Sequence, residues 1–243
     1  MIRQLKRLID QAETVVFFGG AGVSTESGVP DFRSSQGLYR QYQGAEKFLS
    51  PRFLKKDPVT FYTFYRKHFL SDKELTPNQA HIGLAELEAR GKLAAIITQN
   101  VDRLHQKAGS KTVYELHGRA DTFTCRSCGK VYTKDQIRQM DHVPYCSCGE
   151  ILRSDVVLFD EGLEPKTHEQ AIRAIEQADL LIIGGSSLRV YPAAGLLRYQ
   201  KPGGKKVLIN LEPGNTPVEL EINRPIGEVF GELMQLYEME ERE

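Results

Sequence analysis

The chain lacks an excess of charge of either sign. Of its 243 residues, 32 are Lys or Arg and 32 are Asp or Glu, so its formal net charge at pH 7 is zero. No whole-chain field therefore steers the protein toward nucleic acid or an anionic membrane. We expect partners to be recognised locally, with neither nucleic acid nor a membrane among them.

Long hydrophobic runs and a secretory leader are also missing. No apolar run approaches the roughly 20 residues that a helix needs to span a bilayer. The stretch from Met1 to Arg7 has no apolar core followed by a cleavage site. These absences predict a cytoplasmic protein in a reducing compartment.

Cysteine is scarce, but the four cysteines that occur are clustered. Two residues separate Cys125 from Cys128, and one residue separates Cys146 from Cys148. In a reducing compartment this pattern favours a metal over disulfides, because two pairs of thiolates on tight turns can complete the tetrahedral shell of zinc. Since sulfur fills all four positions, we predict a structural zinc. The alternative is a zinc ribbon that touches nucleic acid, but acidic residues offset its basic ones and no basic stripe forms.

The remaining sequence alternates between strand-like and helix-like segments, which argues for a mainly parallel sheet with helices on both faces. The predicted strands cover residues 14–18, 93–98, 112–116, 156–159, 179–183 and 206–210. The predicted helices cover residues 1–12, 76–90, 103–108, 165–177, 193–199 and 228–240. The expected fold is α/β, with a Rossmann-like domain of residues 1–33, 76–120 and 153–243. Two insertions, helical over 34–75 and zinc-binding over 121–152, would form a small domain.

Four of the predicted strands end in small polar clusters. These clusters are Gly19-Gly20-Ala21-Gly22-Val23-Ser24, Gln99-Asn100-Val101-Asp102, His117-Gly118 and Gly184-Gly185-Ser186-Ser187. In an open parallel sheet, ligands bind in the crevice outside the carboxyl ends of the strands, where clusters far apart in sequence meet. We therefore expect the four clusters to line one crevice of a kind that binds a dinucleotide.

The first cluster is similar to a phosphate-binding turn. Gly20 and Gly22, between a strand and an expected helix, would let the backbone approach a pyrophosphate. However, Thr25 occupies the third glycine position of the dehydrogenase fingerprint, and the ribose-binding acid of the next strand is absent. Hydride transfer is therefore not favoured. Taken alone, the segment fits an ordinary tight turn equally well.

Three further features have both functional and ordinary interpretations. Asp31-Phe32-Arg33 could cover a ribose and a pyrophosphate or a nicotinamide ring, or could form a surface ion pair beside a buried Phe. Desolvation is costly for Gln99, Asn100 and Asp102, and hydrogen bonds to ribose hydroxyls and a carboxamide would offset that cost. In the ordinary interpretation the three residues simply form a polar turn at the end of a strand. His117, at a strand end, could accept a proton near neutral pH, whereas the other five histidines fit structural positions.

Five sequence blocks occur in order along the chain, with the cysteine pairs between the last two. The blocks are Gly20-Ala21-Gly22-Val23-Ser24, Gly28-Val29-Pro30-Asp31-Phe32-Arg33, Gln99-Asn100-Val101-Asp102, Leu116-His117-Gly118 and Gly185-Ser186-Ser187-Leu188. In this order they resemble the sirtuin family of NAD-dependent protein-lysine deacylases, in its bacterial form. The resemblance covers nearly the whole chain.

The resemblance implies an NAD site and a catalytic pair. His117 would be the general base, and Asn100 would orient the reacting ribose and water. NAD would be bound by Gly20, Ala21, Gly22, Thr25, Asp31, Phe32, Arg33, Gln99, Val101, Asp102, Gly185, Ser186, Ser187, Asn210, Leu211, Glu212 and Ile226. The stretch from Arg153 to Glu161 would pair its backbone with a substrate peptide by strand addition. Ser154 and Asp160 depart from the family pattern there.

The implied function is NAD-dependent protein-lysine deacetylation. The acyl group of an acetylated protein or peptide would move to ADP-ribose with release of nicotinamide, NAD being the co-substrate and zinc a structural metal. Relatives that remove succinyl groups carry a Tyr-x-x-Arg pair, whereas this chain has Tyr62 followed by Tyr65. We therefore predict deacetylation over desuccinylation. Two alternatives stay open: a mono-ADP-ribosyltransferase, and a non-catalytic NAD-binding or zinc-ribbon interaction module.

Overall fold

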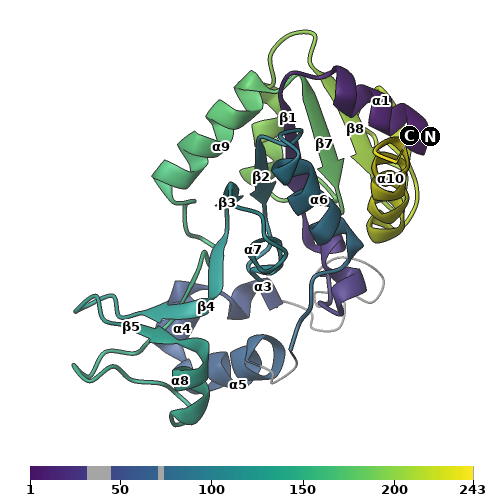
Figure 1. The fold of residues 1–243 in the computed structure, drawn as a ribbon. Helices are drawn as coiled ribbons and strands as arrows, with labels where there is room; N and C mark the ends of the chain where they lie inside the picture. Colours follow the sequence, from purple (N-terminus) through teal and green to yellow (C-terminus); the bar gives the residue numbers. More distant parts are fainter. Residues whose placement is uncertain (32–44, 71–73, 243) are drawn as a thin grey trace.

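The computed structural model of the chain describes residues 1–31, 45–70 and 74–242. Two predicted NAD contacts, Phe32 and Arg33, lie outside these described residues. Figure 1 shows a larger unit built on a sheet and, below it, a smaller unit of short strands and helices. The residue boundaries predicted between the two units stay a prediction.

Six strands form one parallel sheet in the larger unit, as predicted. Their order across the sheet is β3 (Val113–Glu115), β2 (Ala95–Thr98), β1 (Val15–Gly19), β7 (Leu180–Gly184), β8 (Lys205–Ile209) and β9 (Leu220–Ile222). Every residue of β1 and of β7 is buried. Continuous apolar strands of this kind are typical of a parallel sheet that is covered on both faces. The carboxyl ends of β2, β1 and β7 are adjacent, so their polar clusters lie side by side.

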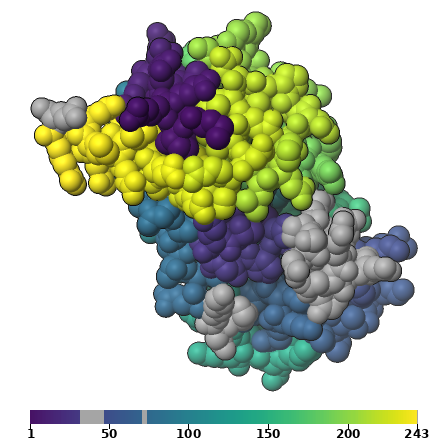
Figure 2. Space-filling model, turned by 90° about the vertical axis from the view of Figure 1, so that its right-hand side faces the viewer, coloured from purple at the N-terminus to yellow at the C-terminus, as the bar shows by residue number. Residues whose placement is uncertain are grey.

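Helices cover both faces of this sheet. On one face α1 (Ile2–Gln11), α6 (Gln79–Ala89) and α10 (Ile226–Glu240) share an apolar core with Val15 and Phe17 of β1. On the other face α9 (Pro165–Gln177) and the 3₁₀ helix η3 (Ala193–Tyr199) pack with the alternate residues Val16 and Phe18. Figure 2 shows the N-terminal residues, in purple, against the yellow C-terminal helix. In the described part of the chain, no helix has the length and apolar character that crossing a membrane requires.

The smaller unit combines both insertions around one core. Its antiparallel sheet has the order β5 (Val131–Thr133), β4 (Gly118–Thr124) and β6 (Ser154–Val156). Its helices are α3 (Ala45–Phe48), α4 (Pro51–Lys56), α5 (Pro58–Phe69) and α8 (Lys134–Gln139). Tyr62 and Tyr65 of α5 pack with Phe123 of β4 in a core that also holds Cys125 and Cys146. This arrangement confirms the predicted α/β fold with a helical and four-cysteine module.

The segment after β1 corrects the predicted phosphate-binding helix. Two 3₁₀ turns, η1 (Ala21–Val23) and η2 (Thr25–Ser27), follow Gly20 in place of an α-helix. They end at Gly28, which has a φ of +81°. The phosphate contacts predicted for this segment would therefore come from the backbone of the glycine-rich turn and not from the N-terminus of a long helix.

Several other elements also differ from the predictions, among them β5 and α8, which were not predicted. β6 ends at Val156, whereas a strand was predicted over 156–159, because the chain turns after Leu158. The segment 193–199 is a 3₁₀ helix instead of an α-helix. The strands β4 and β9 were not predicted. The short helix α7 (Leu104–Lys107) lies within the predicted range 103–108.

Candidate active site

The loops that follow β1, β2 and β7 contact one another, as predicted from their polar clusters. The N–H of Gly22 donates to the carbonyl of Gly185 at 2.8 Å. The N–H of Gln99 donates to the carbonyl of Gly19 at 3.0 Å, and its side-chain amide donates to the hydroxyl of Ser186 at 3.0 Å. Three segments that are far apart in the sequence therefore meet at one edge of the sheet.

Glycine is required at two positions where these loops meet. A Cβ on Gly22 would lie 2.7 Å from the Cα of Gly185, and a Cβ on Gly185 would lie 2.3 Å from the nitrogen of Val23. Gly185 also has a φ of +56°, a region that favours glycine. The hydroxyl of Thr25 donates to the carbonyl of Gly22 at 3.0 Å, which fixes the turn from the other side. The close contact between the two loops by itself requires glycine at both positions, whether or not a pyrophosphate binds there.

Asn210 joins the loop after β8 to the same edge. Its amide oxygen accepts from the N–H of Ser186 at 3.1 Å, and its amide nitrogen donates to the carbonyl of Ser186 at 3.0 Å. The neighbouring residues Ser187, Leu211 and Glu212 are exposed. These predicted NAD contacts thus lie beside the Ser186–Asn210 pair, with their polar groups accessible.

Ile226 lies at the start of α10, and its side chain is buried. A Cβ on Gly184 would lie 2.5 Å from the Cδ1 of Ile226. The next N–H, that of Gly227, donates to the carboxylate of Glu26 at 2.7 Å. The structure therefore joins the beginning of α10 to the segment after β1, although the side chain of Ile226 itself faces the core.

Ser24 connects several of the polar side chains at the centre of this edge. Its hydroxyl is buried, donates to the carboxylate of Asp102 at 2.7 Å and accepts from the amide of Asn100 at 3.0 Å. The same oxygen lies 3.3 Å from Nε2 of His81. The second carboxylate oxygen of Asp102 accepts from the N–H of Leu104 at 3.0 Å. Both Asn100 and Asp102 are therefore held in fixed orientations, by Ser24 from the segment after β1 and by Leu104 from the start of α7.

A pair of buried histidines lies behind Ser24 and was missed by the sequence analysis. The ring centroids of His81 and His105 are 4.8 Å apart, and both rings are almost fully buried. Burial lowers the pKa of His81 to about 4, although the charge of Asp102 acts in the opposite direction. Burial, together with the nearby His81, lowers the pKa of His105 to about 3. Both histidines are therefore neutral at pH 7.

The two histidines predict a loss of stability in acid. In the unfolded chain both histidines have a pKa of about 6.5. Below this pH the unfolded chain therefore binds more protons than the folded protein. The free energy of unfolding should fall by about 2 kcal/mol per histidine between pH 7 and pH 5. Urea unfolding at the two pH values measures this effect. The variant His105→Phe, which keeps an aromatic ring against Phe17, should show a smaller loss. An identical pH dependence in variant and wild type would contradict the assignment.

His117 lies in the loop after β3, next to the loop that follows β2. Its Nδ1 lies 2.9 Å from the carbonyl oxygen of Gln99. Because a carbonyl only accepts hydrogen bonds, Nδ1 carries the proton of the neutral ring, and Nε2 is the nitrogen with a lone pair. Leu116, the preceding residue, donates its N–H to the carbonyl of Thr98 at 2.9 Å. The half-buried imidazole is thus fixed in the tautomer that a general base needs.

The remaining predicted contacts near this edge are Asp31 and Val101. Asp31 is half-buried at the end of the described segment 1–31. The carbonyl of Val101 accepts from the N–H of Ala120 at 3.0 Å, which ties the loop after β2 to the start of β4. Val101 therefore lies between Asn100 and Asp102, on the same loop and beside the connection to the smaller unit.

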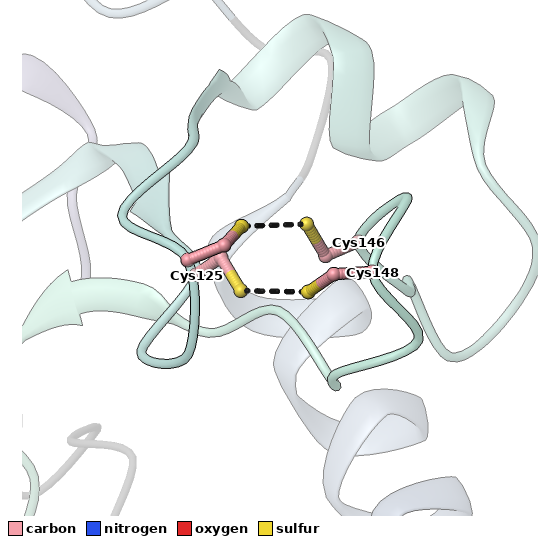
Figure 3. A group of neighbouring side chains, drawn as sticks. Cys125, Cys146 and Cys148 are labelled. Carbon is pink, nitrogen blue, oxygen red and sulfur yellow. Dashed lines mark hydrogen bonds between the residues drawn. The ribbon is translucent and has the colours of Figure 1, made fainter.

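The four cysteines converge in the smaller unit, as the sequence predicts. All four Sγ atoms lie within 4.8 Å of one another, and the pairs Cys125–Cys148 and Cys128–Cys146 are each 3.5 Å apart (Figure 3). Zinc–sulfur bonds of about 2.3 Å in a tetrahedron place sulfurs about 3.8 Å apart, so the donor set fits zinc. The hydroxyl of Tyr132 donates to the Sγ of Cys146 at 3.3 Å and supports a thiolate there. Four sulfur ligands leave no open position, as expected for a structural metal.

The fold and the site together define an α/β protein with a cluster of polar groups at the carboxyl edge of a parallel sheet and, in addition, a four-cysteine module. The Sir2 family model matches residues 20–192. An NAD-dependent protein deacetylase of Clostridium acetobutylicum is 46% identical over 237 residues, which are 94% of this chain and 96% of that protein. The chain therefore belongs to the Sir2 family, the sirtuins.

Solved structures agree with this assignment. A Sir2 variant in complex with a deacetylated p53 peptide and 3′-O-acetyl ADP ribose superposes with a TM-score of 0.91 at 36% identity, over 97% of this chain and 98% of that chain. A Sir2 complex with a p53 peptide and NAD⁺ superposes with a TM-score of 0.86 at 35% identity, over 98% of this chain and 99% of that chain. Both superpositions extend over the larger and the smaller unit of this chain.

Proposed function

We propose that this chain removes acetyl groups from lysine side chains of proteins and transfers them to the ADP-ribose part of NAD, with release of nicotinamide. Its family membership makes it an NAD-dependent protein deacetylase. The observation that supports the assignment of its residues is the contact of His117 with the carbonyl of Gln99, because it leaves Nε2 as the ring nitrogen with a lone pair, on a residue held against the loop that carries Asn100. Amide, hydroxyl and carboxylate groups at this edge suit the hydroxyls and carboxamide of NAD.

His117 is the proposed general base. NAD supplies an activated ribose, since its nicotinamide is a cationic leaving group. The acyl oxygen of the bound acetyl-lysine would displace nicotinamide from C1′ of the ribose. Nε2 of His117 would then accept the proton of a ribose hydroxyl, and that hydroxyl would attack the acyl carbon while this carbon is still bonded to the lysine nitrogen. Water would complete the release of the lysine amine and O-acetyl-ADP-ribose. Positioned proton transfer of this kind contributes about a hundred- to ten-thousand-fold to the rate.

Asn100 and Asp102 are the proposed orienting residues. Because Ser24 accepts one N–H of Asn100, the rest of the amide is presented in a fixed direction to a ribose and to water. Asp102, held by Ser24 and by the N–H of Leu104, would fix the nicotinamide carboxamide together with Val101. Phe32 would shield the cation. Preorganised polar groups act without reorganising during the reaction, which is why these contacts serve catalysis.

The phosphates and the adenosine are assigned to the other side of the edge. We assign the phosphates to Gly20, Ala21, Gly22, Thr25, Arg33, Gly185, Ser186 and Ser187. The adenosine ribose is assigned to Asn210, Leu211 and Glu212, and the adenine to the backbone at Ile226. Asp31 and Gln99 would contact the nicotinamide half. The shared hydrogen bonds of Ser186 with Asn210 and Gln99 support a continuous binding edge from one half of NAD to the other.

The helical insertion favours an uncharged acyl group. Tyr62 and Tyr65 are buried in the core of the smaller unit, and the hydroxyl of Tyr62 donates to the carbonyl of Leu152. Arg66 donates to the backbone carbonyls of Asp141 at 2.6 Å and His142 at 2.8 Å. Its guanidinium therefore stabilises the segment after α8 and is not available to pair with an acyl carboxylate.

We predict that acetyl-lysine peptides are turned over in preference to succinyl-lysine peptides. A succinyl carboxylate would be desolvated without a cation, so kcat/KM should be at least about tenfold lower than for acetyl. Matched acetyl, butyryl and succinyl peptides measure this preference. The butyryl peptide is the control because it has nearly the length of succinyl without its charge. Comparable kcat/KM values for acetyl and succinyl peptides would overturn the prediction.

Peptide-dependent release of nicotinamide tests the proposed function. We expect nicotinamide to appear only when NAD and an acetyl-lysine peptide are both present. A non-catalytic NAD-binding or zinc-ribbon module would release none. A mono-ADP-ribosyltransferase would instead leave a stable label from NAD on the acceptor protein. Either result would contradict the proposal.

The cytoplasm is the proposed location. The proposal rests on the four clustered thiols, which suit zinc in a reducing compartment better than disulfides. The proposed division of the chain assigns residues 1–33, 76–120 and 153–243 to the larger unit, and residues 34–75 and 121–152 to the smaller one. Limited proteolysis that cleaves first near these junctions would support the division.

A further inference from the structure

A tight turn follows the edge strand β6 and contains a residue in an uncommon conformation. The N–H of Glu161 donates to the carbonyl of Leu158 at 3.2 Å, which closes a turn over residues 158–161. Asp160, the third residue of this turn, has a φ of +69°. Glycine adopts this conformation most easily, and Asp and Asn are the side-chain-bearing residues that tolerate it best. A carboxylate therefore stands where the backbone alone would favour glycine.

The turn is held rigidly by its neighbours. Arg153 makes two hydrogen bonds of 2.7 Å with the carboxylate of Glu161 and a third, of 3.1 Å, with the carbonyl of Val156. The carboxylate of Glu161 also accepts from the N–H of Leu158 at 2.9 Å. These contacts fix both ends of the turn, so the position of Asp160 is set by the fold.

Asp160 also carries charge that the turn itself does not neutralise. The adjacent Glu161 is paired with Arg153. Partial burial acts to raise the pKa of Glu161, but the Arg153 guanidinium lowers it below its usual range, so this pair is fully ionised and internally balanced. Asp160 is exposed, and within the described ranges it forms no ion pair. One negative charge is thus presented to solvent at a fixed place.

That place is close to the proposed general base. The N–H of Val157 donates to the carbonyl of His117 at 2.8 Å. Three residues of chain span at most about 11 Å, so the Cα of Asp160 lies within that distance of the Cα of Val157. A substrate peptide bound as an added strand advances about 3.3 Å per residue. With the acyl-lysine paired beside Val157, the Cα of Asp160 therefore lies no more than about three residue spacings of the peptide away from it.

We propose that Asp160 is a specificity-determining residue that selects acyl-lysine peptides with Arg or Lys next to the acyl-lysine. This inference rests on the proposed deacetylase function and on the peptide pairing with residues 153–161. The turn supplies the rigid backbone, and Asp160 supplies the charge that reads the flanking side chain. Exposed pairs of opposite charge are modest in strength, so the expected effect on KM is about two- to five-fold.

Two acetyl-lysine peptides of equal length test this proposal, one with Arg and one with Glu at the positions flanking the acetyl-lysine. Wild-type protein should have a KM for the Glu peptide about two- to five-fold above that for the Arg peptide at low salt. The ratio should approach one at high salt, because exposed charges are screened. In the variant Asp160→Asn, which keeps a residue that tolerates positive φ, the ratio should be close to one at low salt.

Glu219→Gln is the matched control, because Glu219 is exposed next to β9, at the opposite edge of the large sheet from β3. It should keep the wild-type ratio. A wild-type ratio of one, or a ratio that Asp160→Asn leaves unchanged, would overturn the proposal. If the Asp160→Asn variant turned over neither peptide, the wild-type protein would decide the proposal. A KM ratio of about two to five that approaches one at high salt would support it, and a ratio of one at low salt would overturn it. Absence of turnover with every acetyl peptide in the wild type would contradict the proposed function instead.

Discussion

Replacement of His117 by alanine is expected to lower kcat by about a hundred- to ten-thousand-fold. The variant loses the base at Nε2 and one hydrogen bond to the carbonyl of Gln99. A single hydrogen bond contributes only about 1 kcal/mol to stability, so the variant should stay folded and should still bind NAD. Steady-state turnover of an acetyl-lysine peptide, with NAD binding measured by calorimetry, separates the two effects.

A second histidine provides the control for this experiment. His168 lies in the first turn of α9 and is not among the residues assigned to NAD or to the metal. The variant His168→Ala should keep turnover close to that of the wild type. Near-normal turnover in His117→Ala, with zinc and fold intact, would remove His117 from the mechanism.

Loss of the metal is expected to disorder the smaller unit. Cys125 and Cys146 belong to the same buried core as Tyr62 and Phe123, so the metal joins the two insertions. Binding of structural zinc contributes about 10–16 kcal/mol in zinc-finger peptides, far more than a core of this size supplies alone. The variant Cys146→Ala should bind little zinc, and trypsin should cleave it within the smaller unit.

Activity should fall along with zinc content. His117 is followed directly by β4, and its carbonyl accepts from the N–H of Val157 after β6, so disorder of the small sheet would displace the base. Ser127→Ala is the matched control, because Ser127 is exposed between the ligands Cys125 and Cys128 and is not itself a ligand. A zinc-free Cys146→Ala protein with full activity and wild-type resistance to trypsin would contradict a structural role for the metal.

Features carried by local sequence were predictable in this chain. The apolar runs that became β1 and β7 are buried on both faces, so their hydrophobicity alone indicated a parallel sheet. The cysteine spacing predicted a four-sulfur site, which the fold confirms. Polar residues directly after buried strands predicted a common edge, because the topology of a parallel sheet brings such ends together.

Features that depend on tertiary contacts were not predictable. β4 reads Gly-Arg-Ala-Asp-Thr-Phe-Thr and buries only Phe123 fully, so no apolar alternation marks it as a strand. β9 has three residues and pairs only with β8 at the sheet edge. His81 and His105 are neighbours only because α6 and α7 meet in the fold. The residues next to each histidine in the sequence do not indicate that its ring is buried. The contact of the glycine turn with Gly185 was not predictable either, because Gly185 is far away in the sequence.

The most direct test of the central claim is mass spectrometry of the products formed from NAD and an acetyl-lysine peptide. The proposed reaction predicts equal amounts of deacetylated peptide, nicotinamide and O-acetyl-ADP-ribose. A peptide that gains an ADP-ribosyl group, or one that stays acetylated while the folded, zinc-loaded protein binds NAD, would contradict it.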